Sequence, residues 1–126
     1  MKKIKLSRKS QQKKRLVKNL LSSLILFEQI KTTSAKAKAL KQDGQRLISK
    51  IKSEKNEVNL KRYLSGELYG GAREKAYDNR DLLTSIEIYK LSKRLGDGAN
   101  IVIVKLSKSQ LSPAEVKEKA SEKSKK

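Results

Sequence analysis

The sequence predicts an α+β fold with two layers, in which an N-terminal basic arm and helices pack on a small sheet that includes a C-terminal antiparallel hairpin. Apolar residues recur at helical spacing through the first half of the chain. The last third instead holds two runs of β-branched and long apolar residues, separated by turn-forming residues. At 126 residues the chain suits one domain, and we expect an arm over 1–9, a globular domain over 10–108 and a charged tail over 109–126.

The arm is a basic segment with little apolar periodicity. Its cations are Lys2, Lys3, Lys5, Arg8 and Lys9. A segment of this composition buries too little apolar surface to offset the entropy lost on ordering, so we expect it to be flexible in water.

A first helix is expected from Ser10, its candidate N-cap, to about Phe27. Its apolar stripe follows the i, i+4, i+8, i+11 spacing and comprises Leu16, Leu20, Leu24 and Phe27, widened by Val17, Leu21 and Ile25. Its first two turns carry the cations Lys13, Lys14, Arg15 and Lys18. Because cations at this end oppose the helix dipole, the pattern favours a helix held by an external polyanion. A solvated charged end is the alternative.

A short strand over 29–32 and a second helix over 35–52 are expected next. The β-branched residues Ile30 and Thr32 favour the strand, and Thr33 or Ser34 is the candidate helix cap. The apolar line of the second helix consists of Ala37, Leu40, Leu47, Ile48 and Ile51. The Asp43-Gly44 step inside it indicates either a kink or close backbone approach, or simple tolerance of a glycine.

The middle of the chain is expected to be helical and close to charge-balanced. Asn56 is the candidate cap of a helix over 58–64 that ends at Ser65-Gly66. Residues 67–77 have a helical composition interrupted by Gly70-Gly71, and 78–81 have the composition of a loop.

A hairpin is expected in the last third. Its strands cover 83–91 and 100–106 around the turn 95–99, with the run Ile101 to Val104 close to the core. Beyond it, Ser112-Pro113-Ala114-Glu115 has the pattern of a capping box, so the tail is expected to be partly helical or disordered.

The charge distribution indicates a polyanionic partner. The chain holds 32 Lys+Arg against 13 Asp+Glu, a net charge of +19. Residues 1–55 contribute 17 of these cations against Glu28, Asp43 and Glu54, which leaves +14 in that segment. Nucleic acid is the leading candidate partner, and an anionic membrane surface is the weaker one.

Enzyme chemistry is disfavoured by the residues that are missing. Cys and His are absent, which removes thiol nucleophiles, imidazole bases and the usual transition-metal ligands. The carboxylates are scattered, and Gly96-Asp97-Gly98 has the composition of a turn. We therefore expect no catalytic activity, cofactor, metal site or small-molecule substrate.

No membrane partner is expected either. The N-terminus lacks the apolar segment of a signal peptide, and the longest apolar cluster, over 20–27, is too short to span a bilayer. These features favour a soluble, cytoplasmic protein.

The composition of the cations favours binding to phosphates. Lys outnumbers Arg by 25 to 7, which favours diffuse neutralisation over bidentate reading of bases. No aromatic residue lies among the basic residues of 1–22, so we expect no stacking platform for single strands there. The pattern indicates a clamp on the phosphate backbone of folded RNA. A free architectural nucleic-acid-binding protein and a membrane-surface binder are the alternatives.

Three segments carry a resemblance to a known family. Lys5-Leu6-Ser7-Arg8 is similar to a K-L-G-R arm, and the run from Ser23 to Lys38 follows the pattern S-L-I-x-x-E-x-I-x-T-T-x-x-K-A-K. The run from Arg94 to Leu106 is similar to R-x-G-D-x-A-x-M-V-I-x-E-L. Over about residues 5–106 the chain thus resembles the bacterial large-subunit ribosomal protein seventeen (the L-seventeen family), as a divergent member.

The chain departs from the family pattern at identifiable positions. Ser7 stands in place of a Gly, and Phe27 stands where His is common. Glu87 stands where the family has Arg, and Lys105 stands where it has Glu.

The resemblance implies a two-layer α/β fold, a cytoplasmic place on the large ribosomal subunit, and binding to large-subunit rRNA. It also implies neighbouring large-subunit proteins near the tunnel exit as partners. Charge and resemblance together predict an rRNA-binding set made of Lys2, Lys3, Lys5, Arg8, Lys9, Lys13, Lys14, Arg15, Lys18, Lys31, Thr32, Thr33, Lys36, Lys38 and Arg94.

Overall fold

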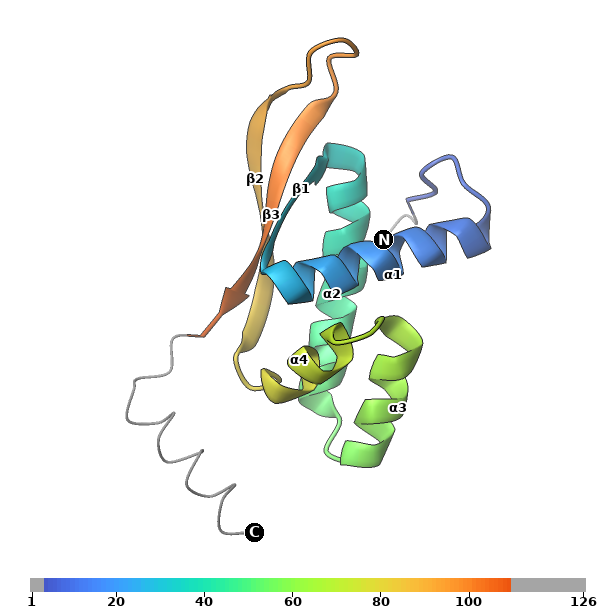
Figure 1. Ribbon diagram of the computed structural model, residues 1–126, viewed down its shortest axis with the longest axis vertical. Helices are drawn as coiled ribbons and strands as arrows, with labels where there is room; N and C mark the ends of the chain where they lie inside the picture. The colour runs from blue at the N-terminus through green and yellow to red at the C-terminus, as the bar shows by residue number, and fades with distance from the viewer. Residues whose placement is uncertain (1–3, 110–126) are drawn as a thin grey trace.

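The computed structural model describes residues 4–109 as four helices and three strands. Figure 1 shows them in chain order: α1 (Ser10–Phe27), β1 (Gln29–Thr33), α2 (Ser34–Ser53), α3 (Glu57–Glu67), α4 (Ala72–Asp78), β2 (Leu83–Lys93) and β3 (Asn100–Lys108). Lys2, Lys3 and the predicted capping box at 112–115 lie outside the described residues.

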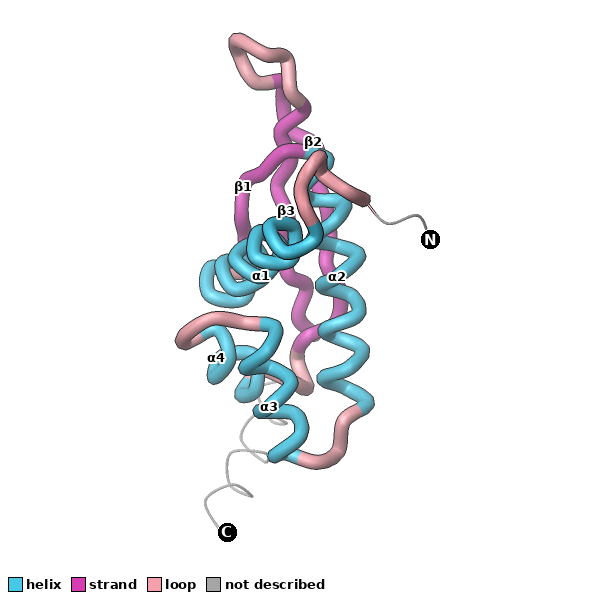
Figure 2. Tube along the Cα trace, turned by 90° about the vertical axis from the view of Figure 1, so that its right-hand side faces the viewer, coloured by secondary structure: helices cyan, strands magenta, loops and turns pink. Residues whose placement is uncertain are grey.

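The three strands form one antiparallel sheet with β3 in the middle, in the order β1-β3-β2. The register pairs Lys31 with Ile103 on one side of β3 and Tyr89 with Ile103 on the other. α1 and α2 lie over one face of this sheet, as Figure 2 shows, with α3 and α4 beyond them at one end. The predicted two-layer α+β fold and the C-terminal hairpin are confirmed.

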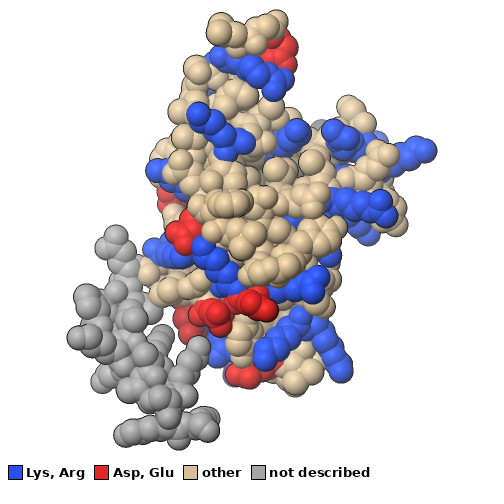
Figure 3. Space-filling model, in the orientation of Figure 1, with Lys and Arg blue, Asp and Glu red and all other residues tan. Residues whose placement is uncertain are grey.

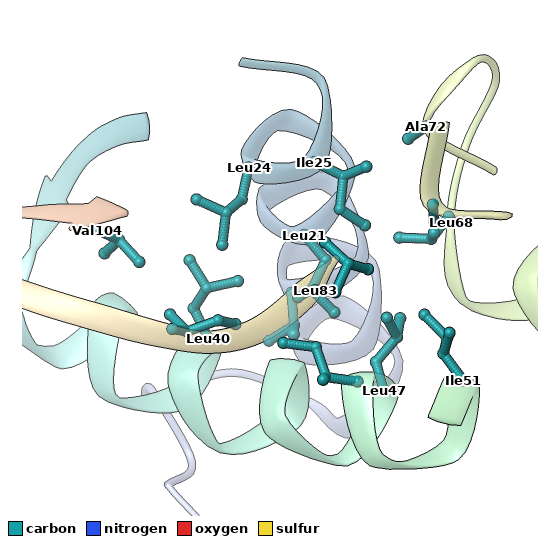
Figure 4. Packing of buried hydrophobic residues seen from close by; sticks show 14 of the residues in the cluster. Leu21, Leu24, Ile25, Leu40, Leu47, Ile51, Leu68, Ala72, Leu83 and Val104 are labelled. Carbon is teal, nitrogen blue, oxygen red and sulfur yellow. The ribbon is translucent and has the colours of Figure 1, made fainter. Parts of the chain in front are cut away.

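The core lies between α1, α2 and the sheet. In Figure 4, side chains from α1 and α2 point toward those of β2 and β3, and the short loop before α4 closes one end with Leu68. Alternation along β3 buries Val102 and Val104 and leaves Ile101 and Ile103 half-buried on the outer face, so the run predicted to lie near the core does so at every second residue.

The predicted apolar stripe of α1 is wrong in part. The buried residues are Val17, Leu21, Leu24 and Ile25, whereas the side chain of Phe27 is 72% exposed. Apolar residues cover more than half of the helix circumference here, so periodicity alone admits two overlapping stripes. The helix contacts α2, the sheet and α4 together, and these contacts select the arc around Leu21.

The helix ends differ from the expected caps at several points. Lys9 and Thr33 occupy the N-cap positions of α1 and α2, and neither side chain makes a capping hydrogen bond. Ser10 is therefore not the N-cap of α1, and Thr33 is at the N-cap of α2 without the expected side-chain bond. Asn56 does cap α3, since its Oδ1 accepts from the N–H groups of Val58 and Asn59 at 3.0 and 3.4 Å. α3 runs on to Glu67 instead of ending at Ser65-Gly66.

Glu28 sits at the reversal between α1 and β1. It adopts φ 64°, which is uncommon for a residue with a side chain, and its N–H closes the helix on Leu24. Its carboxylate accepts from Lys75 of α4 at 3.1 Å and from Lys108 of β3 at 2.6 Å. Its carbonyl accepts from the N–H of Leu106. One residue therefore ties three elements together.

Gly44 of α2 allows the helix to approach β2 closely. A Cβ at this position would lie 2.2 Å from Cδ1 of Ile86 and 3.1 Å from Cδ2 of Leu21. Ile86 is buried, so its side chain has little room to yield. Of the two predicted readings of Asp43-Gly44, the close approach is the correct one, and α2 continues through it as an α-helix. None of the helices in residues 4–109 is long and apolar enough to span a membrane.

Gly44→Ala should destabilise the fold by about 1 kcal/mol, because overpacking against Ile86 exceeds the gain in helix propensity. In the Ile86→Val background, which lacks Cδ1, the same change should cost clearly less. Urea unfolding measures both values. The control is Gly66→Ala, where a Cβ meets no atom within 4 Å and the change should stabilise by up to about 1 kcal/mol. Equal effects at Gly44 and Gly66 would contradict the close approach.

The ion pairs of Glu28 should make stability pH-dependent. Hydrogen bonds from Lys108 and Lys75 lower the pKa of Glu28 below its ordinary 4.5. Its contribution is therefore present at neutral pH, above the unfolded pKa, and is lost as the pH falls through the lower folded pKa. With the Glu28 side chain 46% exposed, we expect Glu28→Gln to cost no more than about 1 kcal/mol at pH 7.

The difference in unfolding free energy between wild type and Glu28→Gln should shrink as the pH is lowered below 4.5. Urea unfolding at several pH values measures it. Asp81→Asn, at an exposed carboxylate outside these ion pairs, is the control. A gap for Glu28→Gln that stays constant down to pH 3 (about one and a half units below the ordinary pKa) would show that the carboxylate charge does not hold the three elements.

Candidate nucleic-acid interface

Most of the predicted site residues that the structure describes gather at two concave surfaces. The first, which we call the α1 groove, has a volume of about 670 Å³ and is lined by Lys13, Lys14, Arg15 and Lys18 of α1. The second, the hairpin groove, has about 520 Å³ and is lined by Lys31, Thr32, Thr33, Lys36 and Arg94. The predicted residues of the α1 groove come from one stretch of sequence, whereas the hairpin groove joins residues 31–36 to the distant Arg94.

The α1 groove is completed by residues that sequence reasoning missed. Arg46 of α2 adds a fifth cation to its lining and forms an ion pair with Asp43 at 3.3 Å. Tyr63 of α3 and Tyr69 of the loop between α3 and α4 line the same groove. Neither tyrosine is near the basic cluster in the chain, so only the folded structure, in which both line the groove, reveals them.

A buried hydroxyl fixes the position of Tyr69 relative to the cations. Ser22 is almost completely buried, and its Oγ donates to the carbonyl of Lys18 and accepts from the N–H of Tyr69, both at 2.9 Å. The Nζ of Lys18 lies 4.2 Å from the centre of the Tyr69 ring, in a cation–π contact. No aromatic residue lies among the basic residues of 1–22 in the sequence, but the fold brings Tyr69 beside them. The expectation that no stacking platform for single strands lies there stays a prediction.

The hairpin groove brings together residues more than fifty positions apart. β1 supplies Lys31 and Thr33, which pair with Ile103 and Ile101 of β3. The far end of the hairpin supplies Lys93, which the sequence reading missed, beside the predicted Arg94. No acidic side chain lines this groove within the part of the chain that the structure describes.

Arg94 holds the hairpin turn in shape. Its guanidinium forms an ion pair with Asp97 and its Nε donates to Oδ1 of Asp97 at 3.0 Å. Oδ1 also accepts from the N–H of Ala99, and the N–H of Arg94 donates to the Ala99 carbonyl. The guanidinium lowers the pKa of Asp97 far below its ordinary value. Arg94, a predicted RNA-binding residue, thus already has a structural partner within the turn.

The arm residues Lys5, Arg8 and Lys9 are exposed beside the start of α1. Leu6 and Ser7 both have positive φ, 56° and 50°, in a turn closed by the N–H of Arg8 and the carbonyl of Lys5. A residue without a Cβ suits this backbone best, and the related pattern has Gly at the place of Ser7. Ile4 and Leu6 pack against the core, while the flexibility predicted for 1–9 stays a prediction.

Lys38 lies away from both grooves. It lines the exposed face of α2 together with Lys41, Arg46 and Lys50. Figure 3 shows Lys and Arg crowded on the projection formed by the start of α1 and the preceding loop, and again on the hairpin. Acidic side chains are concentrated at the opposite end, where residues 57–81 carry Glu57, Glu67, Glu74, Asp78 and Asp81.

This arrangement is suited to binding anions. The two grooves present ammonium and guanidinium groups that can each approach a phosphate oxygen. Among residues 4–109, no group of three or more acidic side chains is placed to hold a metal ion. The surface therefore offers charge neutralisation and shape, together with two tyrosine rings.

The two departures from the family pattern in the hairpin face each other across the sheet. Glu87 of β2 is the direct neighbour of Lys105 of β3. Hydrogen bonds from Ser107 and Tyr89, together with the charge of Lys105, lower the pKa of Glu87. Where the pattern has Arg and Glu at these places, this chain has Glu and Lys, so the pair keeps opposite charges with the signs exchanged.

Comparison with known proteins gives a consistent match. A family described as Ribosomal protein L17 matches residues 16–107. The large ribosomal subunit protein bL17 of Endomicrobium trichonymphae is 34% identical over 106 residues, which cover 77% of this chain and 87% of that protein. That of Methylacidiphilum infernorum is 30% identical over 85% of this chain and 86% of its own length. That of Salinibacter ruber is 34% identical, and this chain spans 54% of its length.

Proposed function

Because the chain belongs to the ribosomal protein L17 family, we propose that it is a structural constituent of the large ribosomal subunit in the bacterial cytoplasm. In this proposal it binds folded large-subunit rRNA and stabilises it by neutralising phosphates. The observation that carries the proposal beyond family membership is the α1 groove, where five cations from two helices line one concave surface.

The start of α1 supports a role for an external polyanion. Its first turn holds no acidic residue, and its N–H groups there have no side-chain cap. Lys13, Lys14 and Arg15 follow within two turns, where positive charge is unfavourable next to the helix dipole. An RNA phosphate beside this end would interact favourably with both the N–H groups and the cations.

The hairpin groove supports a second contact with phosphates. Lys31, Lys36 and Lys93 face a surface that also holds the hydroxyls of Thr32 and Thr33. Two separate basic grooves, one lined by the helices and the other mainly by β1 and the hairpin, would allow the protein to hold two RNA segments at once. The acidic and balanced surface of α3 and α4 would then face away from the RNA.

The open face of the sheet supports contacts with neighbouring proteins, which we place near the tunnel exit by family resemblance. No helix among the described residues covers this face, which carries Ile103 and Tyr89 beside Lys105. Its mixed composition is typical of protein interfaces. A catalytic role has no support in the described residues or in the family.

Sedimentation of the tagged chain from its own cells tests the proposal. Under subunit-dissociating conditions and after a high-salt wash, we expect it in stoichiometric amount in the large-subunit fraction. Recovery at the top of the gradient, or together with DNA, would favour a free architectural nucleic-acid-binding protein and contradict the ribosomal assignment.

The α1 groove should determine the salt dependence of rRNA binding. The triple variant Lys13→Gln, Lys14→Gln, Arg15→Gln should bind large-subunit rRNA more weakly, with the slope of log K against log[salt] reduced by about 2 to 3. Filter binding between 50 and 200 mM salt (about the range in which such contacts dominate affinity) measures it.

The matched control for this variant is Lys52→Gln, Lys55→Gln, Arg62→Gln. It removes the same charge from exposed positions at the other end of the helices. Only a small change in slope is expected there. If the two triple variants had equal slopes, net charge alone would explain binding and the α1 groove would have no special part in it.

A further inference from the structure

We propose that the α1 groove accepts an unpaired nucleotide of its RNA partner, with the base against Tyr69 and Tyr63 and the phosphate among the α1 cations. This inference rests on the proposed rRNA binding and adds to it the kind of RNA feature that this surface recognises. It differs from the clamp on helical phosphates that charge alone predicts.

The groove combines the two features that binding an unpaired base requires. Aromatic rings provide a surface for stacking, and cations beside them neutralise the attached phosphate. Tyr63 and Tyr69 line the same concave surface as Lys14, Arg15 and Lys18. The lining also holds two carboxylates, Asp43 and Glu67, which its five cations outnumber. Its volume of about 670 Å³ leaves room for one nucleotide.

The position of Tyr69 is fixed in the absence of RNA. Ser22 holds the N–H of Tyr69 and the carbonyl of Lys18 on one buried hydroxyl, so the loop after α3 is attached at that turn of α1. The ring of Tyr69 remains 40% exposed and has the ammonium of Lys18 4.2 Å from its centre. A base that contacts this ring brings its phosphate close to a cation that is already in place.

Other aromatic residues lack this combination. Tyr77 has Lys61 and Arg80 beside its ring but lies in the charge-balanced part of the chain. Tyr89 is 48% exposed on the open sheet face, where its hydroxyl donates to Glu87. Lys105 lies 5.4 Å from the centre of the Tyr89 ring, but Tyr89 lines neither the α1 groove nor the hairpin groove. It therefore serves as a matched control for Tyr69, as an exposed tyrosine beside a lysine but outside the α1 groove.

The test compares two RNA hairpins of equal length, one with a single bulged 2-aminopurine and one in which that nucleotide is paired. The full chain should bind the bulged hairpin more tightly and quench its fluorescence by stacking. Tyr69→Leu should weaken binding of the bulged hairpin by roughly 5- to 100-fold and abolish the quenching, since these are the usual effects of losing a base–aromatic stack. Tyr69→Phe, which keeps the ring, should retain both properties.

Tyr89→Leu should leave binding and quenching unchanged, and urea unfolding of each variant checks that the fold is intact. Equal affinity of the wild type for both hairpins, or full quenching with Tyr69→Leu, would overturn the inference while leaving phosphate binding in place. Failure of the wild type to bind either hairpin at low salt would contradict the proposed RNA binding itself.

Discussion

The chain reversal at Glu28 determines how the helical layer meets the sheet. The left-handed backbone of this residue ends α1 and sends the chain into β1, while its carbonyl joins β3 at Leu106. Its carboxylate then gathers Lys75 of α4 and Lys108 of β3. Elements that are distant in sequence are thereby positioned around the C-terminal end of α1. The basic N-terminal end of the same helix is left free to project from the body of the protein.

The α1 groove depends indirectly on the reversal at Glu28, because that reversal fixes the position of α1. With α1 fixed against the sheet and α2, the loop after α3 packs beside it, and the hydroxyl of Ser22 holds Tyr69 to the same turn as Lys18. Gly44 allows α2, which contributes Arg46, to lie close to β2. The recognition surface is therefore a product of tertiary packing, although most of its charge comes from one short stretch of sequence.

Local sequence signals predicted the elements well and the contacts between them less well. Helical periodicity, Asn56 and the glycine-rich turn each act over a few residues, so the helices, the α3 cap and the hairpin could be read from the chain. The exposure of Phe27 could not, because several apolar stripes fit α1 and only its neighbours choose among them. The tyrosines of the α1 groove were missed for the same reason, since no sequence signal links Tyr69 to Lys18. The engagement of Arg94 by Asp97 depends on turn geometry that motif similarity does not convey.

The antiparallel register also bears on how this family's sequences should be compared. Taken one aligned position at a time, Glu87 and Lys105 look like two losses of a family feature. Their adjacency across β2 and β3 makes them a single exchange of sign within one pair. A relative that carried only one of the two changes would place like charges side by side on the sheet. Within this chain, the charge at either position is therefore balanced by its neighbour on the next strand.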